Sequence, residues 1–96
     1  MLFEWDDAKD KSNIAKHGVG FERAKRIFDG PILTWIDDRK TYGETRMRSI
    51  GWVDGIVILA VIHTNRSGKI RIISARPADR SERKNYEEAL SKRNES

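Results

Sequence analysis

Hydrophobic and polar residues recur at helical spacing in the first part of the chain. Asp6 is a good N-cap for this stretch, because its carboxylate can accept hydrogen bonds from backbone N–H groups of the first turn. Gly18 fits the left-handed position that ends many helices, and Lys16 and His17 place positive charge at the negative end of the helix dipole. The pattern therefore predicts a helix from Asp6 to His17.

A second helical stretch follows, and the hydrophobic period then changes to two. Phe21, Ala24 and Ile27 recur at helical spacing, and Asp29-Gly30-Pro31 ends the segment. Beyond this point the alternation is typical of β-structure. It predicts four strands, over Ile32–Ile36, Glu44–Val53, Ile56–His63 and Lys69–Arg76.

The last part of the chain returns to a helical pattern. Asp79 is a candidate N-cap, and Glu82 three residues later completes a capping box for a helix that runs to about Lys92. The order of elements predicts an α+β fold with two N-terminal helices, a four-stranded, mainly antiparallel meander sheet and a C-terminal helix. A chain of 96 residues has room for one hydrophobic core, so we expect residues 1–96 to form a single domain.

The turn at Asp54-Gly55 sets the expected register of the second and third strands. Both residues tolerate positive φ, which favours a two-residue type I′ turn. Such a turn places Arg46 opposite His63 and Arg48 opposite Val61. We therefore expect Arg46, Arg48 and His63 to share one face of the sheet.

The loop after Thr64 leaves two alternatives for the fourth strand. A four-residue loop would bring Arg76 to the same face, together with Ile70, Ile72 and Ser74. A loop that differs by one residue would bring Arg71 there instead, with Lys69, Ile73 and Ala75. In either case one face gathers several arginines and a histidine, which could hold a phosphate and stabilise a pentavalent phosphorus.

Positive charge is concentrated in the middle of the chain. Residues 39–84 hold eleven Lys/Arg against four Asp/Glu, a balance of +7, whereas the whole chain carries +4. This distribution suits a polyanion such as nucleic acid, and a solvated arginine-rich surface is the simpler alternative. There is no cysteine, and the two histidines are far apart without a metal-spaced carboxylate cluster, so we expect no metal ion and no cofactor.

The sequence also indicates the compartment. The longest apolar run, Ile56–Ile62, is much shorter than the ~20 residues that cross a bilayer. Residues 1–10 lack the basic-then-apolar pattern of a secretory signal. We therefore expect a cytoplasmic protein with no membrane partner.

Basic residues also gather where the last helix begins. Arg80, Arg83 and Lys84 lie in its first turn, where positive charge opposes the helix dipole. Backbone N–H groups and cations converge there, as in a phosphate cradle. The plainer explanations are that Arg76 pairs with Glu82 and that His63 is only the polar end of an apolar strand.

Several spaced motifs together resemble one protein family. They are Glu4-Trp5-Asp6, Lys9, Asn13, Lys16-His17-Gly18-Val19, Phe21-Glu22, Tyr42-Gly43-Glu44, Ile50-Gly51, Asp54-Gly55, Arg71-Ile72-Ile73-Ser74-Ala75-Arg76 and Ser81-Glu82-Arg83. The chain resembles the BrnT toxins of bacterial type II toxin-antitoxin systems over nearly its whole length. This resemblance implies a RelE-like ribonuclease fold and inhibition of translation by RNA cleavage. It also implies neutralisation by a BrnA antitoxin whose ribbon-helix-helix domain would bring the protein to operator DNA.

The residues and the resemblance together predict a metal-independent ribonuclease toxin that uses the 2′-OH of RNA as its nucleophile. We expect Arg46 and Arg76 to hold phosphate and stabilise the transition state, with His63 or Glu82 assisting proton transfer. The expected RNA-binding residues are Arg48, Arg71, Arg80, Arg83 and Lys84. The alternative is a non-catalytic basic module that binds a DNA-binding antitoxin.

Overall fold

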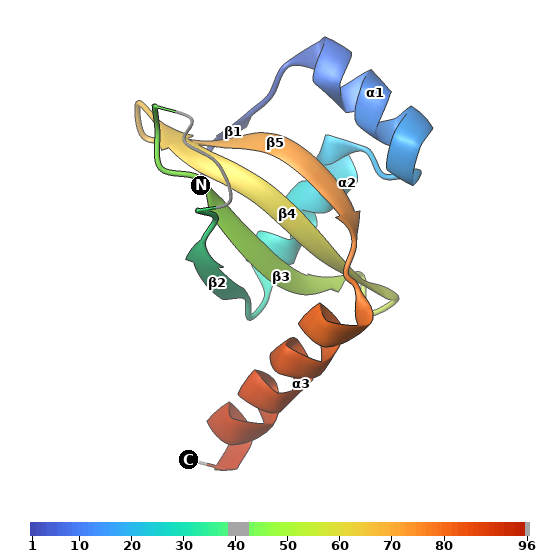
Figure 1. The fold of residues 1–96 in the computed structure, drawn as a ribbon, viewed down its shortest axis with the longest axis vertical. Coiled ribbons are helices and arrows are strands. Elements are labelled where there is room, and N and C mark those ends of the chain that lie inside the picture. The colour runs from blue at the N-terminus through green and yellow to red at the C-terminus, as the bar shows by residue number, and fades with distance from the viewer. Residues whose placement is uncertain (39–42, 96) are drawn as a thin grey trace.

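A computed structural model describes residues 1–38 and 43–95 as a sheet with helices on both faces (Figure 1). The strands are β1 (Phe3–Glu4), β2 (Leu33–Ile36), β3 (Met47–Val53), β4 (Val57–Arg66) and β5 (Lys69–Pro77). The helical elements are α1 (Asp7–His17), α2 (Phe21–Ala24), the 3₁₀ helix η1 (Lys25–Asp29) and α3 (Arg80–Glu95). The predicted α+β class is confirmed.

The sheet has five strands in the order β1-β5-β4-β3-β2. β1 runs parallel to β5, and the other neighbours are antiparallel. The prediction of four strands is therefore wrong, because β1 adds a fifth through a 2.8 Å hydrogen bond from the Ile70 N–H to the Leu2 carbonyl. A strand of two residues has no alternation to detect, so the sequence pattern could not reveal it.

Local capping explains where α1 begins and ends. The Asp6 carboxylate accepts a hydrogen bond from the Lys9 N–H at 2.9 Å. Gly18 has φ of 72° and donates its N–H to the Ile14 carbonyl at 2.8 Å. Both ends of the predicted helix are confirmed, since the left-handed conformation at Gly18 costs a glycine little.

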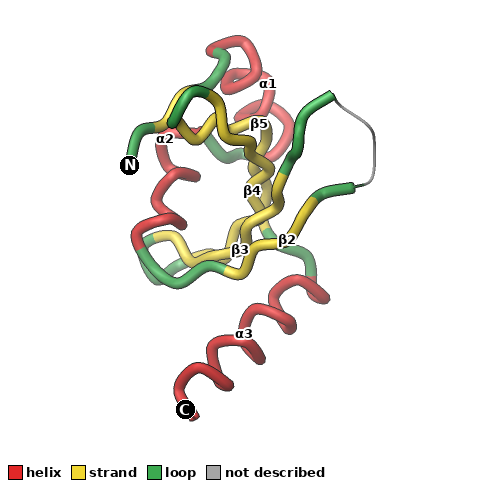
Figure 2. The backbone as a smooth tube through the Cα atoms, turned by 90° about the vertical axis from the view of Figure 1, so that its left-hand side faces the viewer, coloured by secondary structure: helices red, strands yellow, loops and turns green. Residues whose placement is uncertain are grey.

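The sheet separates two hydrophobic clusters. One cluster joins the sheet to α2 and η1 and contains Val19, Phe21, Ala24, Ile27, Val53, Leu59, Val61, Ile72 and Ala75. The other joins the opposite face to α3 and contains Ile50, Ile58, Ala60, Ala78 and Tyr86. Figure 2 shows that α2 and α3 lie well apart, on different sides of the sheet. Each fully buried large side chain contributes about 1.5–3 kcal/mol, so both faces stabilise the fold.

The Asp54-Gly55 turn has the predicted conformation but not the predicted register. Both residues have positive φ, and the Ile56 N–H donates to the Val53 carbonyl at 3.0 Å, as in a type I′ turn. However, Val57 rather than Ile56 lies opposite Val53, so Ile56 is an extra residue in the connection. All pairs along these two strands are therefore shifted by one residue.

This shift overturns the expected grouping of His63 with the arginines. His63 lies opposite Met47, and Arg48 lies opposite Ile62. Because neighbouring residues of a strand point to opposite faces, Arg48 and His63 are on different faces of the sheet. The apolar residues of β4 occupy both faces, so the sequence pattern carried no information about register.

The connection between β4 and β5 also differs from both expected loops. Arg66 pairs with Lys69, so the loop has two residues rather than four. A register irregularity between Ile62 and His63 then places Ile62 opposite Ser74 and His63 opposite Ile72. Arg76 and Ser74 consequently lie on the face of Arg48, as the first alternative predicted, whereas Ile72 lies on the other face. We call the face with Arg48, Ser74 and Arg76 the arginine face, and the opposite one the η1 face.

Candidate active site

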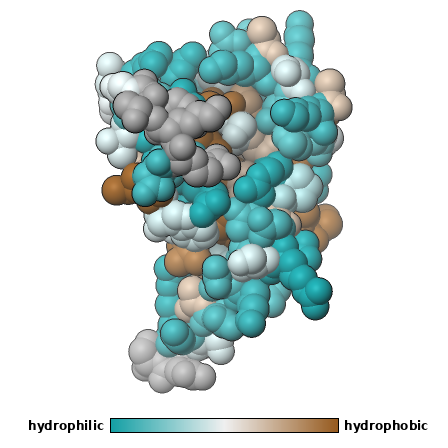
Figure 3. Space-filling view, viewed as in Figure 1, coloured by the Kyte–Doolittle hydropathy of each residue, from teal (hydrophilic) through white to brown (hydrophobic). Residues whose placement is uncertain are grey.

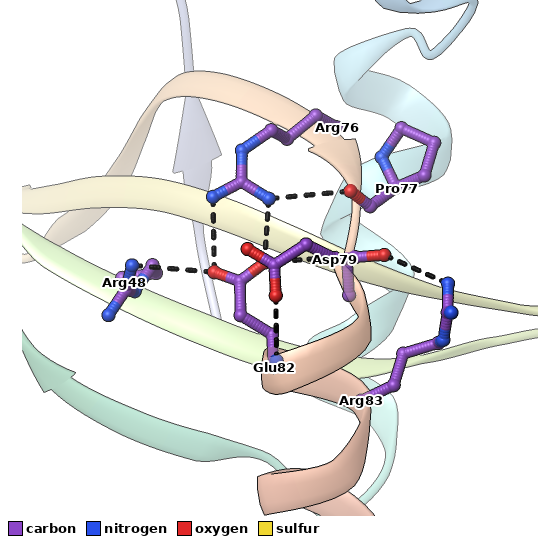
Figure 4. Close-up of polar contacts among 7 residues, drawn as sticks. Arg48, Arg76, Pro77, Asp79, Glu82 and Arg83 are labelled. Atoms are coloured by element: carbon purple, nitrogen blue, oxygen red, sulfur yellow. Dashed lines mark hydrogen bonds and ion pairs between the residues drawn. The ribbon is translucent and has the colours of Figure 1, made fainter.

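Arg76 and Glu82 form a two-pronged ion pair where β5 leads into α3. Nη1 of Arg76 lies 2.6 Å from Oε1 of Glu82, and Nη2 lies 3.0 Å from Oε2 (Figure 4). The Glu82 residue is only 4% exposed, whereas the Arg76 side chain is 31% exposed. From the sequence, pairing with Glu82 was the plainer role of Arg76, and this contact is confirmed.

The predicted capping box holds Glu82 in this position. The Glu82 N–H donates to the Asp79 carboxylate at 2.8 Å, and the Asp79 N–H donates to Oε1 of Glu82 at 2.9 Å. Upstream, the Ala78 N–H donates to the Ile58 carbonyl at 2.9 Å, which ties the strand-to-helix corner to β4. These bonds satisfy backbone donors that a helix start otherwise leaves without partners.

Arg48 reaches the same carboxylate from β3. Its Nη1 lies 3.4 Å from Oε2 of Glu82, and its guanidinium carbon lies 4.3 Å from the centre of the Trp35 ring. Trp35 and Arg48 are directly opposed in the ladder of β2 and β3. Nε of Arg48 is buried without a hydrogen-bond partner within the described part of the chain. Two guanidinium groups thus share one carboxylate.

The ionisation of Glu82 follows from these contacts. Burial by itself would raise the pKa of this carboxyl group, but the hydrogen bonds from Arg76 and the Asp79 N–H and the charges of Arg76 and Arg48 outweigh burial and lower the pKa. The carboxylate therefore stays ionised near neutral pH, with both oxygens engaged. This arrangement favours a role in positioning the arginines over a role in proton transfer.

His63 lies on the η1 face, away from this ion-pair cluster. It is 4% exposed, its Nε2 lies 2.7 Å from Oγ of Ser49, and its ring meets Phe28 edge to face at 5.1 Å between centroids. Oγ of Ser49 lies 2.7 Å from Oγ1 of Thr34, which continues the polar chain to β2. Burial lowers the pKa of His63 to about 4. The imidazole is therefore neutral at physiological pH and does not meet the arginines.

Arg46 and Arg71 are engaged with other carboxylates. Nε of Arg46 lies 3.2 Å from Oε2 of Glu44, and Nη1 of Arg71 lies 2.5 Å from Oε2 of Glu4. Glu44 also lies 3.5 Å from Nη2 of Arg66. The Arg71 pair joins residues 67 positions apart and fastens β1 to β5. Arg46 thus contacts the Glu44 carboxylate, whereas Arg76 contacts that of Glu82.

The remaining basic candidates lie on α3. Arg80 and Lys84 are exposed, and Arg83 donates from Nη1 to the Ala78 carbonyl at 3.2 Å. All three belong to the first turns of the helix, and Figure 4 shows Arg83 near the Arg76 and Glu82 pair. This placement agrees with the predicted basic helix start, where the helix dipole and the cations both favour an anion.

Two functional features escaped the sequence analysis. Trp35 packs against the hydrophobic cluster on the α3 side of the sheet, and its ring also supports Arg48 on the arginine face. Asn13 is the buried polar residue of α1, and its side chain hydrogen bonds to the backbone of Ala75 in both directions, at 2.7 and 3.1 Å. Both contacts depend on elements remote in sequence, so no local pattern could have shown them.

Residues 1–38 and 43–95 contain neither a candidate metal-binding group nor a candidate membrane-spanning helix. No three His, Asp or Glu side chains in these ranges are grouped so that they could hold a metal ion. No helix in the same ranges is long and apolar enough to span a membrane.

The fold and the site define a small basic α+β protein with arginines gathered on one face of its sheet. A family model described as the ribonuclease toxin BrnT of type II toxin-antitoxin systems matches residues 5–82, and the chain belongs to this family. It is thus a ribonuclease toxin with RNA as its substrate and an antitoxin as its partner. The alternative of a non-catalytic binding module is not favoured.

A solved structure supports this membership. The chain is similar to the crystal structure of the ribonuclease toxin BrnT from Brucella abortus, with 27% sequence identity and a TM-score of 0.62. The similarity covers 83% of this chain and 100% of the Brucella chain. No curated protein matches the chain. The predicted resemblance to BrnT toxins is confirmed.

Proposed function

We propose that this toxin cleaves RNA without a metal ion, and that Arg76 and Arg48 hold the scissile phosphate on the arginine face. The observation that carries this proposal is the convergence of both guanidinium groups on the Glu82 carboxylate, at 2.6 to 3.4 Å. A carboxylate and a phosphate present similar pairs of oxygens to an arginine fork. Glu82 therefore holds the two cations in an orientation that suits a phosphate beside it.

The reaction needs few groups from the protein, because RNA carries its own nucleophile. The 2′-oxygen forms a bond to the adjacent phosphorus, the bond from phosphorus to the 5′-oxygen breaks, and the proton of the 2′-hydroxyl is given up while the leaving 5′-oxygen gains one. The products carry a 2′,3′-cyclic phosphate and a 5′-hydroxyl. Negative charge grows on the phosphorane oxygens, where a preoriented guanidinium is most effective.

We assign the proton transfer to neither His63 nor Glu82. His63 is buried on the η1 face, and Glu82 has both carboxylate oxygens engaged with Arg76, Arg48 and a backbone N–H. The original hypothesis that one of them acts as the base has no support in this geometry. Glu82 is instead a positioning residue for the arginines.

The basic start of α3 extends the surface for RNA. Arg80 and Lys84 are exposed, and Arg83 lies at the same helix end. We propose that these cations bind phosphates next to the cleavage site. This proposal assigns the scissile phosphate to neither Arg71 nor Arg46, which contact Glu4 and Glu44.

The proposal includes a partner and a compartment. The family resemblance suggests a BrnA-like antitoxin whose ribbon-helix-helix domain binds operator DNA, and a cytoplasmic site of action. Co-expression of the toxin with the neighbouring reading frame tests this part. A reading frame that neither restores growth nor co-purifies with the toxin would contradict it.

The metal-free mechanism is tested by chelation and by the ends of the products. We expect cleavage to persist in EDTA and to yield cyclic or 3′-phosphate ends together with 5′-hydroxyl ends. Loss of cleavage in EDTA that added magnesium restores, or products with 3′-hydroxyl ends, would overturn the mechanism. Chromatography of a short labelled RNA after single turnover measures both properties.

A further inference from the structure

A cavity of about 190 Å³ lies between α1 and the edge of β5. Its lining includes Lys9, Ser12, Asn13 and Lys16 from the helix, and Ser74 from the strand. A water molecule takes up about 30 Å³ of liquid, so this volume accommodates a phosphate group together with bridging waters. The cavity shares no lining residue with the ion-pair cluster of Arg48, Arg76 and Glu82.

The wall that α1 gives to this cavity is polar, although helices normally turn apolar residues toward a sheet. Positions 9, 12, 13 and 16 are spaced so that they lie on one side of a helix. Asn13 is the buried residue of α1 and fixes the helix to the strand through Ala75, while Ile14 is 48% exposed. Polar bonds rather than apolar packing therefore attach α1, and its lysines remain at the rim.

Two lysine ammonium groups lie at the rim of the cavity. Lys9 and Lys16 are exposed, and neither takes part in the ion pairs found among the described residues. The nearby carboxylates of Asp6 and Asp10 keep their charge and accept hydrogen bonds from the Lys9 N–H at 2.9 Å and from the Phe21 N–H at 2.8 Å. An anion in the cavity would meet two ammonium groups and the hydroxyl groups of serine side chains.

The position of Ser74 links the cavity to the arginine face. Ser74 and Arg76 are two residues apart on the same face of β5, a separation of about 6.6 Å along a strand. Figure 1 shows α1 beside β5, with the start of α3 farther along the same strand. In the same view, hydrophilic side chains cover most of the surface (Figure 3). An extended chain that crosses the strand edge can therefore reach both places.

We propose that the cavity between α1 and β5 binds a backbone phosphate of the RNA next to the cleaved linkage. Lys9 and Lys16 supply the charge, and Ser12 and Ser74 donate hydrogen bonds from their hydroxyl groups. This inference rests on the proposed function, in which Arg76 and Arg48 hold the scissile phosphate. It adds a subsite that selects for RNA longer than a single dinucleotide.

Binding of a short 2′-O-methyl RNA, which cannot be cleaved, tests the subsite apart from the chemistry. The double variant Lys9→Gln/Lys16→Gln should bind several-fold more weakly, and the slope of log K against log salt should fall by about 0.7 for the one lost phosphate contact of a single strand. The control Lys11→Gln/Lys92→Gln removes the same charge from exposed positions outside the cavity. Equal losses in the two double variants would overturn the proposal.

A neutral methylphosphonate, placed at one linkage of that RNA at a time, locates the contact. The wild-type protein should lose affinity at the scissile linkage and at one neighbour, whereas Lys9→Gln/Lys16→Gln should lose sensitivity only at the neighbour. Lys9→Arg/Lys16→Arg, which keeps the charge, should behave like the wild type and exclude a folding defect. An unchanged sensitivity profile in the glutamine variant would contradict the subsite.

Two further outcomes keep this inference separate from the mechanism. If the glutamine variant loses affinity for polyglutamate but not for RNA, the cavity serves an acidic protein segment and the proposal fails. Cleavage of ordinary RNA of the same sequence tests the mechanism independently. RNA binding that depends on Lys9 and Lys16, without any cleavage of ordinary RNA, would support the subsite and refute the mechanism. Normal cleavage of ordinary RNA, with equal RNA binding by the wild type and the glutamine variant, would support the mechanism and refute the subsite.

Discussion

The polar side chains on the two faces of the sheet differ in burial and in charge. On the arginine face, Arg76 and Arg48 are partly exposed and share the buried carboxylate of Glu82. On the η1 face, His63 and Ser49 are buried and bond to each other at 2.7 Å. The first arrangement keeps charge at the surface, where a phosphate can reach it. The second removes its polar atoms from solvent and keeps the histidine neutral.

This difference shows how burial decides the use of a residue. A guanidinium keeps its charge in almost any environment, so partial exposure beside a carboxylate leaves it available to an anion. An imidazole with a pKa near neutrality loses its charge when it is buried. Arginine chemistry is therefore expected on one face, and packing and stability on the other.

The largest expected effect concerns the pH dependence that His63 gives to stability. Its pKa falls from 6.5 to about 4 on folding, so the unfolded chain binds the extra proton between these values. The contribution of His63 to the free energy of unfolding is therefore fully present above pH 6.5. It decreases as the pH falls toward 4, by roughly 3 kcal/mol in total. His63→Phe should remove this decrease while cleavage changes by less than about twofold, as the two-face comparison requires.

Denaturant unfolding at pH 7, 6 and 5 measures this dependence. His17→Gln is the matched control, because it removes the other histidine of the chain. The control should retain the decrease in stability. A His63→Phe protein that keeps the full pH dependence, or that folds normally and no longer cleaves RNA, would refute the assignment of the η1 face to stability.

Glu82→Gln should produce the next largest effect. The carboxylate holds two arginines, and hydrogen bonds to charged groups contribute about 1.5–3 kcal/mol, so we expect a loss of about 1–3 kcal/mol at pH 7. Because folding lowers the pKa of Glu82, its contribution is present above the ordinary carboxyl pKa and is lost as the pH falls through the folded value. The stability difference between wild type and variant should therefore shrink in acid.

Cleavage by this variant separates positioning from proton transfer. A positioning role predicts slower cleavage with the same pH profile and RNA binding at least as tight as in the wild type. Glu87→Gln removes an exposed carboxylate from the same helix and should change neither property. A pH profile that loses its ascending limb only in Glu82→Gln would instead identify Glu82 as the base.

The smallest expected effect concerns Trp35. Its ring lies under the Arg48 guanidinium at 4.3 Å, and a cation–π contact of this kind contributes about 0.5–1 kcal/mol near the surface. Trp35→Phe keeps a weaker contact, so stability should fall by less than about 1 kcal/mol and cleavage by a few-fold. Trp52→Phe, at a residue that is 39% exposed, is the control. Equal effects on cleavage in both variants would remove Trp35 from the site.

The sequence predicts the parts of this molecule that local chemistry controls. The caps at Asp6, Gly18 and Asp79 act over three or four residues, and all three are confirmed. The turn at Asp54-Gly55 has its predicted conformation for the same reason. Short-range hydrogen bonds and φ preferences are properties of a few neighbours, so a single sequence reveals them.

The candidate site was only partly predictable, because it depends on register. One extra residue at Ile56 was enough to move His63 to the other face, and a bulge restored Arg76 to the face of Arg48. The Arg76 and Glu82 pair, six residues apart, was foreseen, whereas the Trp35 and Arg48 contact was not. Strand pairing between distant segments is set by packing that the period of the sequence does not encode.

Single-turnover cleavage and thermal stability of Arg76→Lys, measured on the same sample, test the central claim most directly. Lysine keeps the charge but not the planar fork, so RNA binding should remain nearly normal while cleavage falls by ~10²-fold or more. Such a loss in a protein that remains folded would support phosphate binding by Arg76 in the transition state. A lower melting temperature with an unchanged cleavage rate would show that Arg76 serves only its ion pair with Glu82, and would contradict the account.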